Sequence, residues 1–234
     1  MISDNLNFVK SRIESVKHDQ EVELIAVSKT RSISEIQEAI DAGQFHFGEN
    51  YLQESLEKIA SLKDNNLTWH FIGPIQANKT AGIAENFDWV HSVDRLKIAK
   101  RLSSQRDPNL GQLNILMQIN IDQEETKSGL LIEDIPEIIS EVKELPNIAL
   151  RGFMCIPNPE NSAASFSEMA KLVSKFSYLD SLSMGMSADL ELAIERGATF
   201  VRVGTDIFGK RSYCLLYTSP SPRDVEESRM PSSA

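Results

Sequence analysis

The sequence predicts a single (β/α)8 barrel of the TIM type, which is an α/β fold. Along most of its 234 residues, short apolar runs alternate with amphipathic helical patterns, as parallel β/α units require. Eight such runs occur, and eight parallel strands close most naturally into a barrel. The runs are nearly continuous in apolar residues, which suits strands covered on both faces. An open doubly wound sheet is the structural alternative, but the sequence lacks the glycine-rich nucleotide-binding motifs typical of such sheets.

The strands are expected in a regular order along the chain. The first, E-L-I-A-V-S-K at residues 23–29, precedes a helical pattern with Ile33, Ile36 and Ile40 on one face and Gly43 at its end. A further helical pattern separates each strand from the next. We expect the other strands at residues 45–50, 68–73, 87–93, 113–121, 149–156, 181–185 and 199–205.

The alternation of strands and helices stops shortly after Gly209. The last residues are rich in serine, proline and charge, which is typical of a disordered segment or of one foreign to the domain. We therefore predict a barrel domain at residues 1–211 and a disordered or non-native tail at residues 212–234.

The composition argues against several classes of protein. A net charge of −10 disfavours non-specific nucleic-acid binding, which needs clustered lysine and arginine. The first residues form a helical pattern without the apolar core of a signal peptide, and no run of about 18 apolar residues occurs. Cys155 and Cys214 have neither metal-binding nor disulfide spacing, so no metal site is expected. The expectation is a cytoplasmic protein with no membrane or nucleic-acid partner.

Candidate functional residues follow from the rule that functional groups of a β/α barrel gather at the carboxyl ends of its strands. Lys29 ends the first predicted strand, which places its amine at the barrel mouth. Lysines at strand ends commonly reach water, and this is the simplest interpretation. The functional interpretation is a Schiff-base lysine, because burial and nearby cations lower the pKa of an amine and the free amine attacks aldehydes.

An anion site is predicted across the mouth, after the seventh and eighth strands. Ser187 stands where the next helical pattern begins, so we expect it to be an N-cap beside free N–H groups that attract an anion. Gly204 and Thr205 end the eighth strand and can add backbone donors and a hydroxyl. Arg202 shares a strand face with Gly204, where it can donate to a ring nitrogen or form a structural ion pair.

Together these groups describe a site for pyridoxal 5′-phosphate (PLP). The aldehyde would meet Lys29, the phosphate would meet the turns at Ser187 and Gly204, and the pyridine nitrogen would meet Arg202. Each feature alone is unspecific. Their joint placement on the first, seventh and eighth strands carries the prediction, because the first and eighth strands are neighbours in a closed barrel.

The sequence resembles the pyridoxal phosphate homeostasis proteins, which are small PLP-binding barrels, over about residues 24–211. The resemblance lies in the motifs AVSKT, FGENYLQE, WHFIGPIQANK, INIDQEETKSGL, LRGFMCIP and SMGMSADLELAIERGATFVRVGTDIFG. It implies the barrel fold of the alanine racemase N-terminal domain and a PLP Schiff base on Lys29. For His70, near the same mouth, a polar core position is the simpler interpretation. The other cofactor-binding residues that the resemblance implies are Asn50, Ser183, Ser187, Arg202, Gly204 and Thr205.

The resemblance also implies a protein that holds PLP and affects vitamin B6 balance without established catalysis, so an enzyme is not expected. Physical chemistry agrees, because an arginine does not protonate the pyridine nitrogen and leaves the ring a poorer electron sink. A PLP-dependent amino-acid racemase and a phosphosugar enzyme using Lys29 are the alternatives. The expected form is a monomer or weak dimer with transient contacts to PLP-dependent enzymes.

Overall fold

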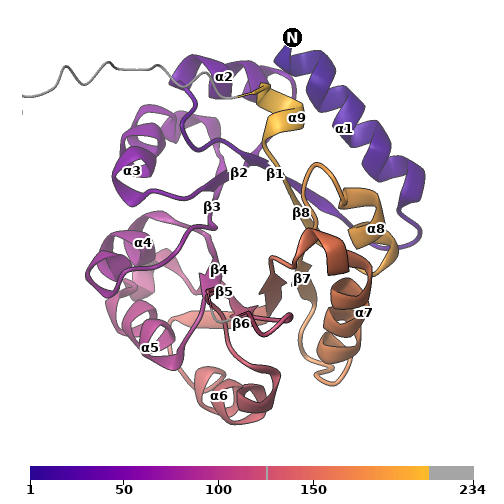
Figure 1. Cartoon of the computed structure of the whole chain (residues 1–234). Helices are drawn as coiled ribbons and strands as arrows, with labels where there is room; N and C mark the ends of the chain where they lie inside the picture. The colour runs from indigo at the N-terminus through magenta and orange to yellow at the C-terminus, as the bar shows by residue number, and fades with distance from the viewer. Residues whose placement is uncertain (125, 211–234) are drawn as a thin grey trace, which may run out of the picture.

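The computed structural model describes residues 1–124 and 126–210, and these residues form the predicted architecture. Eight parallel strands make a closed barrel in the order β1 to β8, and the helices surround it (Figure 1). The single-barrel fold predicted from the sequence is confirmed. The tail predicted at residues 212–234 lies outside the described residues, as does Arg211.

The strands are short and lie where the apolar runs predicted them. They are β1 (Glu23–Val27), β2 (His46–Glu49), β3 (Thr68–Phe71), β4 (Trp89–Val93), β5 (Leu113–Ile119), β6 (Ile148–Cys155), β7 (Ser181–Ser183) and β8 (Phe200–Val203). The α-helices are α1 (Ile2–Val16), α2 (Ile33–Asp41), α3 (Leu52–Ser61), α4 (Thr80–Asn86), α5 (Leu96–Gln105), α6 (Ile135–Val142), α7 (Ser162–Val173), α8 (Leu190–Glu195) and α9 (Thr205–Phe208). Only β6 leaves its predicted range, and it does so by one residue at its start.

Helix α2 shows how local sequence sets an element boundary next to the site. Ser32 Oγ accepts a hydrogen bond from Glu35 N at 3.3 Å, and the Glu35 carboxylate accepts one from Ser32 N at 2.8 Å. This reciprocal pair is a capping box, which satisfies two amides that would otherwise lack partners. The buried side chains of Ile36 and Ile40 then face the core. The helix therefore begins at a defined residue, directly after the segment that carries Lys29.

The barrel closes between β1 and β8, which brings the first and last parts of the described domain together. The register pairs Ile25 with Arg202 and Ala26 with Val203. The carboxyl end of β1 therefore lies beside that of β8. Strand β7 pairs with β8 through Ser183 and Phe200, and the segment after β7 continues alongside β8, because Arg202 N donates to the Gly185 carbonyl. Because all eight strands are parallel, these three ends share one mouth of the barrel.

Helix α1 precedes β1 and covers the outside of this closure. Its buried side chains are those of Leu6, Val9 and Ile13. Figure 1 shows α1 running alongside α8 and α9, with its amino-terminal end near α2, and it contacts all three. It thus braces the helices that follow β7 and β8. Within the described part of the chain, no helix combines the length and apolar character that crossing a membrane requires.

Candidate functional site

A cavity of about 290 Å³ opens at the carboxyl ends of β1, β7 and β8. The predicted site residues that line it are Lys29, Ser187, Arg202, Gly204 and Thr205. Its other lining residues are Val27, Arg31, Met186 and Ala188. One cavity is therefore lined by Lys29, Arg202 and the turns at Ser187 and Gly204. Pairing of β1 with β8 in the closed barrel brings these groups together.

Lys29 lies in a tight turn just beyond β1. Arg31 N donates to Ser28 O at 3.0 Å, which closes a four-residue turn with Lys29 at its second position. Thr30 follows with a φ of 64°, a left-handed conformation that is uncommon for a β-branched residue. The sequence predicted that the strand itself ends at Lys29, whereas β1 ends at Val27 and the turn presents the lysine to the mouth.

Arg202 is a buried cation that is only 5% exposed. Its Nη1 donates to Ser183 Oγ at 2.6 Å, and its Nη2 donates to the Cys155 carbonyl at 2.9 Å. Among the described residues no carboxylate is bonded to it, so the structural ion pair considered above is not formed there. Both of these partners are neutral groups. The nearby Cys155 thiol is neutral too, because burial raises its pKa to about 12. A buried guanidinium whose hydrogen-bond partners are all neutral favours an acceptor ligand in the adjoining cavity.

Three histidines connect Arg202 to the opposite wall of the barrel. His91 Nδ1 lies 2.9 Å from Ser183 Oγ, and its Nε2 lies 2.9 Å from His70 Nδ1. His70 Nε2 in turn lies 3.0 Å from His46 Nδ1. Since these histidines come from β2, β3 and β4 and Ser183 comes from β7, the chain of hydrogen bonds crosses the barrel interior. His70 is fully buried in it, as expected of a polar core residue.

The buried histidines are neutral. Burial lowers the pKa of His70 well below its usual value, and interactions with His91 and His46 add to the effect. Burial also lowers the pKa of His91, and the charge of Arg202 lowers it further. Neutral imidazoles can each donate one hydrogen bond and accept one, so the chain links Arg202 to the barrel wall without a further buried charge.

Ser183 supports Arg202 from inside the barrel instead of lining the cavity. We expect Ser183→Ala to lower the free energy of unfolding by about 1–3 kcal/mol, because it leaves Arg202 Nη1 and His91 Nδ1 without a partner. Ser104→Ala, on the exposed face of α5, is the control and should change it by less than about 0.5 kcal/mol. Urea unfolding measures both. Equal losses in the two variants would contradict the supporting role of Ser183.

The turn after β7 differs from the sequence prediction in one respect. Ser187 is not the N-cap of the next helix, because α8 begins at Leu190 and Asp189 occupies the cap position. Asp189 Oδ1 accepts a hydrogen bond from Met186 N at 2.7 Å and so holds the preceding turn. The predicted cap was wrong because residues 187–189 form a turn that delays the start of the helix, and Asp189 at the cap position makes no side-chain cap hydrogen bond. Ser187 nevertheless lines the cavity.

Arg12 on α1 contacts both turns of the predicted anion site, after β7 and after β8. Its guanidinium donates to the Ser187 carbonyl at 2.9 Å. It also binds the carboxylates of Glu191 in α8, at 2.6 and 2.8 Å, and Asp206 in α9, at 2.7 Å. One side chain thus spans both turns and offsets two carboxylates that would repel an anion in the cavity. Sequence reasoning missed Arg12, which lies 175 to 194 residues away from these partners along the chain.

Gly204 lies on the other side of the predicted anion site, just before Thr205 begins the short helix α9. A Cβ atom at Gly204 would lie 3.3 Å from the Val27 carbonyl oxygen and 3.4 Å from Val27 Cβ. The close approach of β8 to β1 therefore leaves little room for a side chain. The backbone of the turn itself faces the cavity, and Thr205 adds a hydroxyl group.

Asn50 lies at the same mouth but in a second cavity of about 300 Å³. That cavity is lined from β2 to β6 and their loops, and Asn50 is the one predicted residue in it. Asn50 Oδ1 is buried and has no hydrogen-bond partner among the described residues. The structure therefore separates Asn50 from the cavity at Lys29.

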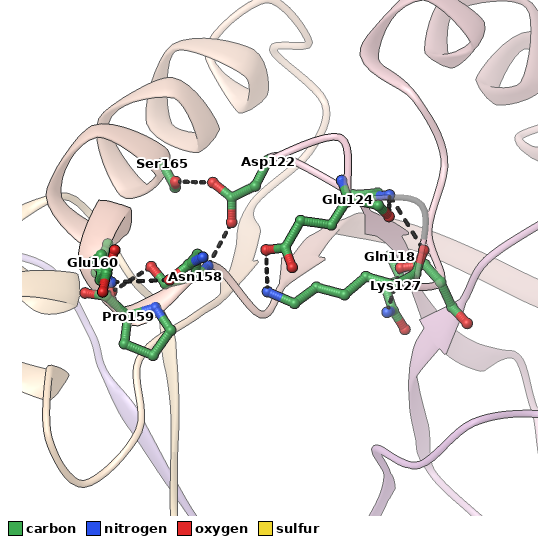
Figure 2. Close-up of polar contacts among 11 residues, drawn as sticks. Gln118, Asp122, Glu124, Lys127, Asn158, Pro159, Glu160 and Ser165 are labelled. Carbon is green, nitrogen blue, oxygen red and sulfur yellow. Dashed lines mark hydrogen bonds and ion pairs between the residues drawn. The ribbon is translucent and has the colours of Figure 1, made fainter.

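Figure 2 shows how the loops beside the second cavity are held. Asp122 accepts hydrogen bonds from Asn158 N at 2.5 Å and from Ser165 Oγ at 2.6 Å, which joins the loop after β5 to the loop after β6 and to α7. On the other side of the same loop, Lys127 Nζ donates to Glu124 at 2.6 Å. Lys127 also lines the second cavity, whose rim is thus a set of braced loops.

Arg31 is a further cavity residue that sequence reasoning missed. Its guanidinium donates to Glu35 at 3.2 Å and also to the Gly209 carbonyl. A signal was available, because a second basic residue two positions after Lys29 is well placed to help bind an anion. No comparable signal marked His91, whose partners come from two other strands.

Comparisons with known proteins agree with this geometry. The family described as alanine racemase, N-terminal domain, matches residues 2–212. The chain is 51% identical over 222 residues to a pyridoxal phosphate homeostasis protein of Pseudomonas aeruginosa, which covers 91% of this chain and 96% of that protein. It is 46% identical over 228 residues to the pyridoxal phosphate homeostasis protein of Escherichia coli, and this alignment covers 91% of this chain and 97% of that protein.

Solved structures lead to the same assignment. PipY of Synechococcus elongatus with PLP bound aligns with a TM-score of 0.80 and 34% identity, covering 89% of this chain and 100% of that one. An alanine racemase of Clostridium difficile aligns with a TM-score of 0.69 and 15% identity over 57% of its length, a likeness that shows the fold alone. The chain therefore belongs to the pyridoxal phosphate homeostasis protein family, built on the barrel of the alanine racemase N-terminal domain.

Proposed function

We propose that the protein holds PLP in the cavity at Lys29 and serves vitamin B6 homeostasis without catalytic turnover. The observation that carries the proposal is the placement of Lys29, Arg202 and the turns at Ser187 and Gly204 around one cavity. Membership of the family supports it, and so does the relative that was solved with PLP bound.

The residues around the cavity fit PLP in size and charge. A volume of about 290 Å³ is near the lower end of small-ligand sites, as suits one compact cofactor. Arg202 supplies a buried positive charge that has no carboxylate partner among the described residues. Gly204 lets backbone approach a phosphate closely. A donor set of amine, guanidinium, hydroxyl and backbone suits an anionic aldehyde.

Each lining group has a distinct role in this proposal. Lys29 binds the aldehyde carbon as a Schiff base, and Arg202 donates to the pyridine nitrogen while Ser183 supports it. The hydroxyls of Ser187 and Thr205 and the backbone at Gly204 bind the phosphate. Asn50 lines the neighbouring cavity, and its Oδ1, which has no hydrogen-bond partner among the described residues, would approach the cofactor from that side of the mouth.

Arg202 also favours holding the cofactor over turnover. A bound PLP supplies an electron sink, and the sink is strongest when the pyridine nitrogen carries a proton. An arginine keeps its own protons, so it donates a hydrogen bond to that nitrogen without protonating it. The proposal includes a monomer or weak dimer in the cytoplasm that contacts PLP-dependent enzymes transiently.

Borohydride trapping tests the proposed attachment. The parent protein, incubated with PLP and reduced, is expected to carry a pyridoxyl label on the peptide that contains Lys29. Lys29→Ala should carry none on that peptide, whereas Lys100→Ala, at an exposed position in α5, should match the parent. Peptide mapping by mass spectrometry provides the measurement. A parent protein labelled only at other lysines would contradict the proposal.

A second measurement separates holding from turnover. The PLP-loaded protein is incubated with a panel of amino acids in deuterated water, and exchange of the α-proton is followed by NMR. No exchange above the level of free PLP is expected. Exchange with loss of optical rotation would instead favour the racemase alternative.

A further inference from the structure

The motif F-G-E-N-Y-L-Q-E at residues 47–54 contains two carboxylates that do not line the cavity at Lys29. Glu49 ends β2 and is fully buried, and Glu54 stands in the first turn of α3. Lys58, one turn later in α3, is only 4% exposed. Its Nζ lies 2.7 Å from Glu49 Oε1 and 2.5 Å from Glu54 Oε1. These side chains form an ion cluster that we call the Glu49–Lys58–Glu54 triad.

The triad binds the main chain on both sides of Lys29. Lys58 Nζ donates to Ser28 O at 2.7 Å, and this carbonyl belongs to the peptide bond before Lys29. Glu54 Oε1 accepts from Thr30 N at 2.5 Å, and this amide belongs to the peptide bond after Lys29.

The hydroxyl of Ser28 adds a third link to the triad. It donates to Glu49 Oε1 at 2.6 Å, so the carboxylate that binds Lys58 also binds the residue before Lys29. Two peptide groups and one side chain of the turn are thus held by charged partners. Hydrogen bonds to charged groups are shorter and stronger than those between neutral groups, so this turn is held more firmly than an ordinary one.

The Lys29 turn contains a strained residue, Thr30, whose conformation requires support from its surroundings. The φ of 64° at Thr30 is a conformation that β-branched residues rarely adopt unless the surroundings impose it. Burying the triad costs free energy, because its ions lose hydration and Glu49 Oε2 has no hydrogen-bond partner among the described residues. An apolar cluster would pack α3 against the barrel at least as well. Packing alone therefore does not account for the triad, whereas control of the Lys29 turn does.

We propose that the Glu49–Lys58–Glu54 triad positions Lys29 for attachment of PLP by holding the peptide groups before and after it in the left-handed turn. Its members are positioning residues, since none of them lines the cavity. The inference rests on the proposed function, because it matters for attachment only if Lys29 receives the cofactor.

Glu54→Ala tests the proposal, since this change removes the acceptor of the Thr30 amide while Lys58 keeps Glu49. The rate of borohydride-trapped labelling at Lys29 should fall about tenfold or more, as loss of a charge-assisted hydrogen bond predicts. In the cofactor-free protein, hydrogen exchange of the Thr30 amide should accelerate by about the same factor. Exchange of this amide reports on the turn independently of any bound PLP.

Two matched variants separate positioning from general stability. Glu141→Ala removes a carboxylate that binds Lys100 on the surface of α5 and α6. Arg106→Met removes a buried cation that binds the carbonyls of Ala84 and Phe87, away from the Lys29 turn. Under conditions where urea unfolding shows each protein folded, both variants should label Lys29 and exchange the Thr30 amide at the parental rate.

A rescue experiment tests the left-handed turn directly. Glycine adopts positive φ at little cost, so Thr30→Gly should restore most of the labelling rate that Glu54→Ala removes. If the triad acted only through stability, the two changes would instead have additive effects.

The outcomes are distinct. Parental labelling and exchange in Glu54→Ala, or equal slowing in Arg106→Met, would overturn the positioning role. A parent protein that takes no label at Lys29 would overturn the proposed function instead, and the Thr30 amide exchange would still decide whether the triad holds the turn.

Discussion

Acidification from pH 7 to pH 5.5 is expected to lower the free energy of unfolding by about 2–3 kcal/mol, because two buried histidines resist protonation. In the unfolded chain, His70 and His91 take up protons below about pH 6.5. In the folded protein their pKa values are well below that, so they stay neutral. The unfolded state then binds more protons, and stability is lost as the pH falls through this window. Above about pH 6.5 the full contribution is present.

Urea unfolding between pH 7.5 and pH 5.5 measures this dependence. His91→Gln removes one of the two titrating groups and should reduce the average slope between pH 7 and pH 5.5 by about half, which is about 0.8 kcal/mol per pH unit. Ser104→Ala, at an exposed position without a titrating group, is the control and should leave the slope unchanged. Burial raises the pKa of Glu49, which acts in the opposite direction, so the difference between variants isolates the histidines. Equal slopes in the parent and His91→Gln would refute the explanation.

Gly152→Ala is expected to lower the free energy of unfolding by at least about 3 kcal/mol. Strand β6 carries one extra residue opposite β5 between Leu150 and Gly152, and Gly152 pairs with Ser181 on β7. A Cβ atom at Gly152 would lie 1.8 Å from the Ser181 carbonyl oxygen. Since that oxygen belongs to the backbone, relief of the clash requires β6 and β7 to separate. The separation would disturb Ser183 and hence the support of Arg202.

The comparison variant for this prediction is Gly111→Ala. Gly111 has a φ of 71° and no heavy atom within 4 Å of an added Cβ. Gly111 has a ψ of −178°, so the substitution costs only the backbone strain of an alanine in a region that almost only glycine adopts, about 1–3 kcal/mol. Urea unfolding of both variants, with near-UV circular dichroism to follow packing in the barrel, provides the test. If Gly152→Ala lowered the free energy of unfolding no more than Gly111→Ala does, β6 and β7 would be shown to separate at little cost, and the prediction would be wrong.

The sequence alone predicted the number and order of the strands, because apolar runs and helical periodicity are local properties of the chain. It also indicated Lys29, Ser187, Arg202 and Gly204, since strand ends in a parallel barrel share one mouth. These residues line the cavity as the alternation implied. Their roles toward PLP stay predictions, as does the tail at residues 212–234.

The tertiary structure alone decided which partners the buried polar groups have. The series of hydrogen bonds from His46 to Ser183 crosses the barrel, so which side chains pair in it depends on strand register and barrel closure. Arg12 meets Asp206 because α1 packs over the closing seam. Lys58 reaches the Lys29 turn because α3 packs behind it. Such contacts join positions far apart in the sequence, and a buried polar group takes whichever partner the closed barrel brings within reach, which no local pattern encodes.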